Sequence, residues 1–109
     1  MPELWTLDLI AYAKTIIIGV GWYSADQWAM LKLAADDPET LDATYQQWCA
    51  GAEKTLQQVK SQPGVRAVKI PVDVQVLRQW CRDHGRPLDG AARAQFIAEA
   101  VKTTTVSEN

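Results

Sequence analysis

The side chains best suited to chemistry in this chain are a thiol and an imidazole three residues apart, Cys81 and His84. On a helix this spacing places both on one face, where they could pair as nucleophile and base or supply half of a metal site. A catalytic pair also needs an orienting group, and a structural metal needs two more soft ligands, for which the sequence offers only Cys49. We therefore expect a core cysteine, a histidine at a helix C-terminus, and no catalytic residue, metal site or cofactor.

An acidic cluster is the next candidate for chemistry, as an oxygen-rich cation site. Its members are Asp36, Asp37, Glu39 and Asp42. The cluster lacks the alternating spacing and central glycine of a calcium loop. Acidic residues are favoured in a first helical turn, so we interpret the cluster as helix capping and a solvated surface.

The segment IIIGVGWYS, with Gly19 and Gly21, is similar to the strand, glycine turn and helix start that hold a dinucleotide pyrophosphate. Ser24 stands at the third small position, and Trp22 and Tyr23 crowd the expected turn. No acidic residue follows a second strand at the distance needed to bind a ribose. We expect the two glycines only to turn the chain.

Basic residues gather in the second half, where residues 56–109 hold eight basic and five acidic side chains, against three and eight in residues 1–55. A helix, a turn at Gly85 and a further helix are loosely typical of a helix-turn-helix, with nucleic-acid contacts from Arg78, Arg82, Arg86 and Arg93. The isoelectric point near 5.3 disfavours binding to phosphates. The preferred interpretation is that these arginines pair with Asp83, Asp89 and the acidic first half.

Five tryptophans make the chain rich in large packing groups. We expect Trp28, Tyr45, Trp48 and Trp80 to meet in one core cluster. Tryptophan and arginine are also the favoured anchors of interfaces, so Trp22, Tyr23 and Trp28 form the predicted interaction surface.

The elements that would position these groups can be read from the pattern. TIIIGV (15–20) and VRAVKI (65–70) are β-branched runs that predict strands, and residues 7–13 fit a short helix or a third strand. Four helices are predicted. The first runs from a capping box of Ser24 and Gln27 to Ala35, and the second begins at Asp37 and Pro38 and runs for about five turns to residue 62. The third runs from Asp73 to a C-cap at Gly85, and the fourth is capped by Asp89 and covers residues 90–102. The fold class is α+β and helix-rich, with two or three short strands in a β-α-α-β-α-α order.

Composition limits the class of protein. Apolar residues at 48% and charged residues at 22% predict one compact domain over residues 1–102, with a frayed tail over 103–109. Residues 7–20 are similar to a short membrane span, but Asp8 and Lys14 interrupt it. Two cysteines are too few for a disulfide framework, so a cytoplasmic location is expected.

Four motifs carry a family resemblance: WYSADQW, TYQQWCAGAEK, IPVDVQVLRQWC and GRPLDGAARAQF. The chain from Trp22 to Val101 resembles small tryptophan-rich bacterial proteins of unknown function, and this resemblance implies no activity. We predict a bacterial accessory or interaction protein, not an enzyme, that pairs with itself as a homodimer or with another protein and does not enter a membrane. A nucleic-acid-binding protein is the alternative, and an enzyme would need a pocket joining His84, Cys81 and a carboxylate.

Overall fold

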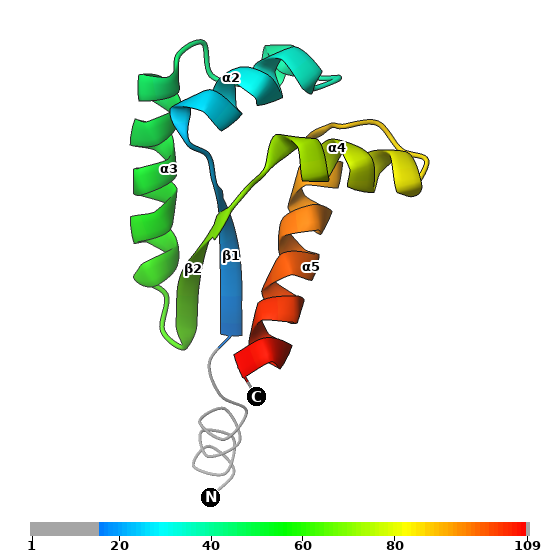
Figure 1. Ribbon diagram of the computed structural model, residues 1–109. Helices are drawn as coiled ribbons and strands as arrows, with labels where there is room; N and C mark the ends of the chain where they lie inside the picture. Colours follow the sequence, from blue (N-terminus) through cyan, green and yellow to red (C-terminus); the bar gives the residue numbers. More distant parts are fainter. Residues whose placement is uncertain (1–15, 109) are drawn as a thin grey trace, which may run out of the picture.

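The computed structural model describes residues 16–108, with side chains up to Lys102. Within this range two strands and four α-helices follow one another in the order β-α-α-β-α-α (Figure 1). Their bounds are β1 (Ile16–Trp22), α2 (Ala25–Ala34), α3 (Tyr45–Lys60), β2 (Val65–Pro71), α4 (Val74–Asp83) and α5 (Gly90–Glu108), with a short 3-10 turn, η1 (Pro38–Thr40), before α3. The predicted helix-rich α+β class and element order are therefore confirmed.

The two strands are parallel, in a register that runs from Ile16 beside Val65 to Trp22 beside Pro71. Parallel neighbours need a long crossover, which α2 and α3 supply. Helix α3 covers one face of the strand pair and α5 covers the other (Figure 1). The suggested third strand at residues 7–13 lies outside the described residues.

The two faces of β1 differ in the size of their side chains. On the α3 face Trp22 meets the ring of Trp48 edge-on, with centroids 5.5 Å apart. On the α5 face Gly19 and Gly21 leave room for Ile97. The expectation that these glycines turn the chain is wrong: both lie inside the strand, where the absence of a Cβ lets a helix approach closely.

A helix begins at its predicted capping residues only where their side chains have no other partner in the tertiary structure. Ser24 caps α2 by accepting a hydrogen bond from the Gln27 amide at 3.2 Å. The Gln27 side chain does not complete the box, because its Oε1 accepts a bond from the Val74 amide at the start of α4, at 2.7 Å. In this way one residue links two helix N-termini.

The long helix begins later than predicted. Asp37 makes no side-chain capping bond, and the segment after it forms only the turn η1. Thr44 and Gln47 instead form a complete capping box, with the Gln47 amide donating to Thr44 Oγ1 at 3.1 Å, so α3 starts at Tyr45. Because the Asp37 carboxylate does not cap a helix, it can bind a partner outside its own loop.

The second half agrees more closely with the sequence pattern. Asp73 caps α4 through the amides of Gln75 and Val76. Gly85 adopts the predicted left-handed conformation at φ 60°, and Asp89 Oδ1 accepts a bond from the Ala92 amide at 2.9 Å. Helix α5 continues beyond the predicted end, to Glu108.

A core of aliphatic and aromatic side chains joins the helices to the sheet. Its largest fully buried side chains are Leu31 of α2 and Val74 and Leu77 of α4. Within residues 16–108 no helix is both long and apolar enough to cross a membrane.

Candidate functional site

The largest described hollow follows the outer edge of β1, the edge that does not face β2. Its volume is about 670 Å³, within the range of ligand-binding pockets. The floor is β1 from Ile17 to Gly21. Its walls are Thr55 and Val59 of α3 on one side and Ala94, Ile97, Ala98 and Val101 of α5 on the other.

Backbone hydrogen bonds show which groups of β1 face this hollow. The Ile16 amide donates to Gly64 O at 2.8 Å and Trp22 O accepts from the Val72 amide at 3.0 Å, so both residues direct their backbone toward β2. Because backbone groups alternate along a parallel strand, Ile17, Gly19 and Gly21 direct theirs outward, into the hollow. We name this surface the β1-edge groove: the hollow together with the outward N–H and C=O groups of these three residues.

A second, smaller hollow extends the groove on the α3 side. It has a volume of about 350 Å³ and shares Val20, Gly21 and Thr55 with the first. Two large apolar side chains of the same strand are also open to solvent, Ile16 at 64% and Ile18 at 40%. An exposed apolar strand with a free edge is a surface that proteins commonly cover.

Four polar side chains line the groove: Tyr23, Thr55, Arg93 and Lys102. Burial raises the pKa of the Tyr23 phenol, and the nearby charge of Arg93 opposes this effect. The phenol is therefore neutral at physiological pH.

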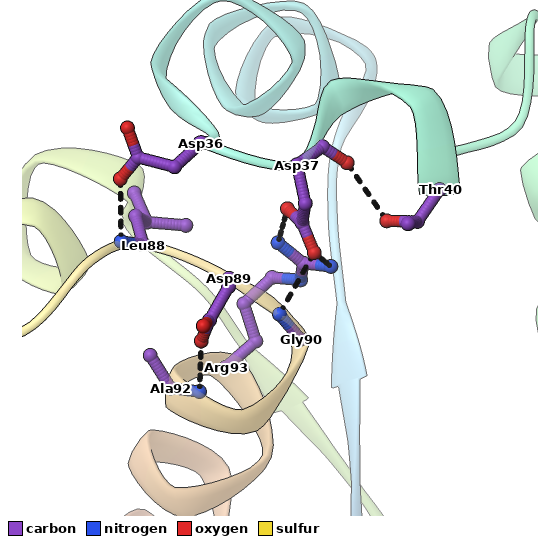
Figure 2. Close-up of polar contacts among 8 residues, drawn as sticks. All are labelled: Asp36, Asp37, Thr40, Leu88, Asp89, Gly90, Ala92 and Arg93. Carbon is purple, nitrogen blue, oxygen red and sulfur yellow. Dashed lines mark hydrogen bonds and ion pairs between the residues drawn. The ribbon is translucent and has the colours of Figure 1, made fainter.

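Arg93 of α5 is held in place by the carboxylate of Asp37, in the loop after α2 (Figure 2). Its two terminal nitrogens donate to the two oxygens of Asp37 at 2.8 and 3.1 Å, and the Gly90 amide adds a third bond at 2.9 Å. The hydrogen bond from Arg93 is the main reason that the pKa of Asp37 is lowered. These three bonds to the Asp37 carboxylate, named the Asp37 fork, neutralise the Arg93 cation and fix the N-terminus of α5.

Asp36 forms hydrogen bonds of its own beside the ion pair of Asp37 and Arg93 (Figure 2). Its Oδ2 accepts a bond from the Leu88 amide at 2.8 Å, and its own amide donates to Leu88 O at 2.8 Å. Two members of the acidic cluster thus connect the loop after α2 to the loop before α5. Among the described side chains no three His, Cys, Asp or Glu residues gather as a metal site requires.

The four arginines do not form one surface. Arg78, Arg82 and Arg86 line a hollow of about 230 Å³ together with Asp36, whereas Arg93 lies at the β1-edge groove. Arg82 donates to Gln79 of its own helix, α4, and Arg86, in the loop after α4, donates to Gln95 of α5. Arg93 with Asp37 realises the predicted pairing with the acidic first half, though with a different partner than Asp83 or Asp89.

Cys81 and His84 are both used for packing. Cys81 is buried in the core, and burial raises the pKa of its thiol, which disfavours the reactive thiolate. The His84 ring stacks on Trp80, with centroids 4.2 Å apart, and its Nδ1 lies 2.8 Å from the Trp80 carbonyl oxygen. His84 thus lies at the end of α4, as the sequence predicts.

The predicted aromatic interaction surface lies largely inside the molecule. Tyr23 and Trp28 are buried, with 6% and 4% of their surface exposed, and only Trp22 is half-buried. Trp48 stacks on Trp28 and meets Tyr23 edge-on, both at 5.4 Å, while Tyr45 donates to Tyr23 O. These rings are covered by their own chain, so a partner would meet little of Tyr23 or Trp28.

The four aromatic residues expected in the core belong to one hydrophobic cluster, with Trp28 buried in it and Tyr45, Trp48 and Trp80 packed against it, so this prediction is confirmed. Within the cluster Trp80 packs edge-on against Phe96 of α5, with centroids 5.8 Å apart.

Sequence reasoning missed the β1-edge groove. Two glycines two positions apart in a strand leave one face bare, but here α5 packs on that face, so they did not indicate the groove at the edge. What the sequence lacks is any sign of which edge of the strand stays free.

No family model, curated protein or solved structure matches the chain. The similarity of Trp22 to Val101 to small tryptophan-rich bacterial proteins therefore stays a prediction, and function rests on the geometry above.

Proposed function

We propose that this chain is a small bacterial accessory protein of the cytoplasm that works by binding extended segments of protein at the β1-edge groove, without catalysis. The observation that carries the proposal is the outward backbone of Ile17, Gly19 and Gly21, which no strand among residues 16–108 pairs, on the floor of an apolar hollow. Strand addition uses such an edge, with main-chain bonds for affinity and flanking pockets for alternate side chains.

The walls of the groove support this mode of binding. Helices α3 and α5 stand on either side of the edge, and Thr55, Ala94 and Ala98 leave space between them. A strand laid beside β1 would be sandwiched between two helical layers, as inner strands of α/β proteins are.

Two further observations support the non-catalytic and cytoplasmic parts of the proposal. The groups that a nucleophilic enzyme would use, Cys81 and His84, are engaged in packing. Both cysteines are free thiols, as is usual in a reducing compartment.

A peptide titration tests the proposal. The probe is a soluble peptide of alternating threonine and valine with lysine at both ends, followed by residue-resolved NMR on protein dilute enough to be monomeric. We expect the amide signals of Ile17, Gly19 and Gly21 to shift and their hydrogen exchange to slow. Absence of any change at these three amides would overturn the proposal.

Duplex DNA is the second probe, because Arg78, Arg82 and Arg86 share one hollow and represent the alternative function. We expect no binding at physiological salt. Binding that weakens steeply with salt and shifts the signals of these three arginines would favour the nucleic-acid alternative instead.

A further inference from the structure

We propose that the occupant of the β1-edge groove is the β1 strand of a second copy of this chain, paired antiparallel about a two-fold axis at Gly19. The inference rests on the proposed function and names its partner. It predicts one four-stranded sheet across the dimer, in the order β2-β1-β1-β2.

The register follows from the outward-facing residues. Gly19 is the central residue of β1 and faces outward. A two-fold axis there places Gly19 beside its own copy and Ile17 beside the partner's Gly21, so each outward N–H and C=O meets a complementary group. All three pairings are then of the hydrogen-bonded antiparallel type.

Apolar side chains meet across the pair in this register. On the α5 face, each Ile17 lies beside Gly21 of the other copy, over which Ile97 of that copy packs. On the α3 face, Ile18 lies beside the partner's Val20 and Ile16 beside the partner's Trp22. The exposed side chains of Ile16 and Ile18 are then covered, which gives the association an apolar contribution.

The strand type of the groove also fits this partner. Two cations line the groove: Arg93 is neutralised within its own chain by Asp37, and Lys102 is exposed to solvent. The strand from Ile16 to Trp22 carries no charge and no proline, and so lacks the residues with which proteins block edge pairing.

The chain ahead of β1 is the competing occupant. To pair antiparallel with β1 it would have to reverse direction directly before Ile16. Residues 13–15 are Ala, Lys and Thr, without the glycine, asparagine or aspartate that tight hairpin turns use. A second copy needs no turn, and for that reason we favour it.

Register-specific crosslinking of the full chain is the decisive test, with Cys49→Ser in every variant to remove the less buried native thiol. In the proposed dimer residues 18 and 20 of opposite copies form a non-hydrogen-bonded pair about 4.5 Å apart between Cα atoms, close enough for a disulfide. We expect Ile18→Cys mixed with Val20→Cys to give a covalent dimer under mild oxidation. Ile18→Cys mixed with Ile16→Cys is the out-of-register control, and equal crosslinking there would overturn the proposed pairing.

Sedimentation at several concentrations supplies a second, independent readout. Ile18→Lys places a charge on the edge and should raise the dissociation constant of the dimer by about tenfold or more. Leu33→Lys is the matched control, since Leu33 on α2 is 90% exposed and does not line the groove. An equal effect of both substitutions, or an effect of Leu33→Lys alone, would overturn the proposal.

The outcomes separate this inference from the proposed function. A strictly monomeric chain whose groove still accepts the threonine–valine peptide overturns the second copy as occupant but keeps the strand-binding function. A monomer whose Ile17, Gly19 and Gly21 amides are already protected points to the chain's own preceding residues, and also overturns it.

Discussion

The two faces of β1 are packed by opposite means. On the α3 face large rings fill the space, with Trp22 against Trp48 and Trp48 in turn against Trp28. On the α5 face the strand contributes Gly19 and Gly21, and α5 brings Ile97 and Val101 close to the backbone. Large side chains hold one helix at a distance and missing side chains admit the other, and the edge between them stays open as a groove.

Removing an aromatic ring on the α3 face of β1 should cause the largest loss of stability. Trp28→Ala leaves a cavity in the core and should reduce the free energy of unfolding by about 3–5 kcal/mol. Denaturant unfolding followed by circular dichroism measures it.

Trp28→Phe sharpens the same test. The Trp28 Nε1–H is the buried side-chain donor without a partner among the described residues, so phenylalanine removes an unsatisfied group as well as volume. We expect a loss under about 2 kcal/mol. A loss as large as that of alanine would show that the indole N–H matters in a way this packing does not explain.

Adding a side chain on the α5 face of β1 should cause the next largest loss of stability. A Cβ at residue 19 would overlap Val101 Cγ2 and lie 3.0 Å from Ile97 Cγ2. Gly19→Ala should therefore reduce the free energy of unfolding by about 1–3 kcal/mol. Combining it with Val101→Ala should recover part of that loss, and strict additivity of the two losses would contradict the proposed close approach.

A smaller effect is expected at the fork that fixes the start of α5. Asp37→Ala removes the bonds from Arg93 and Gly90 and should cost about 1 kcal/mol, because the pair is only partly buried. Glu39→Ala, an exposed carboxylate in the same loop, is the control and should change little.

The fork also predicts a pH dependence. The pKa of Asp37 is lowered in the folded protein, chiefly by the hydrogen bond from Arg93, so its contribution to stability is complete above the ordinary pKa near 3.8. It is lost as the pH falls below that value and through the folded pKa. Unfolding titrations between neutral and acidic pH should show a shallower loss for Asp37→Ala than for the unaltered chain.

The smallest effect should come from the glycine of α3, which contrasts with the glycines of β1. A Cβ at Gly51 meets no atom within 4 Å. Gly51→Ala should raise the free energy of unfolding by about 0.5–1 kcal/mol, because alanine favours the helix. Destabilisation would mean that Gly51 is contacted, for instance by a partner beside the smaller hollow that it lines.

Local chemistry in the sequence determined the element order, both strand positions, the caps at Ser24, Asp73 and Asp89 and the left-handed Gly85, because each depends on a few neighbouring residues. Asp37 shows where this reasoning fails. As a local signal it predicts a helix start, yet its carboxylate binds Arg93, and the helix begins at the next available capping box.

Tertiary structure alone decided which surfaces are covered and which are free. Sequence could not show that Tyr23 is buried, or that Gly19 and Gly21 contact a helix, since both depend on residues far along the chain. The outer edge of β1 has the same origin: hydrogen-bonding capacity is equal on both sides of a strand, and within residues 16–108 the placement of β2 decides which side is left unpaired.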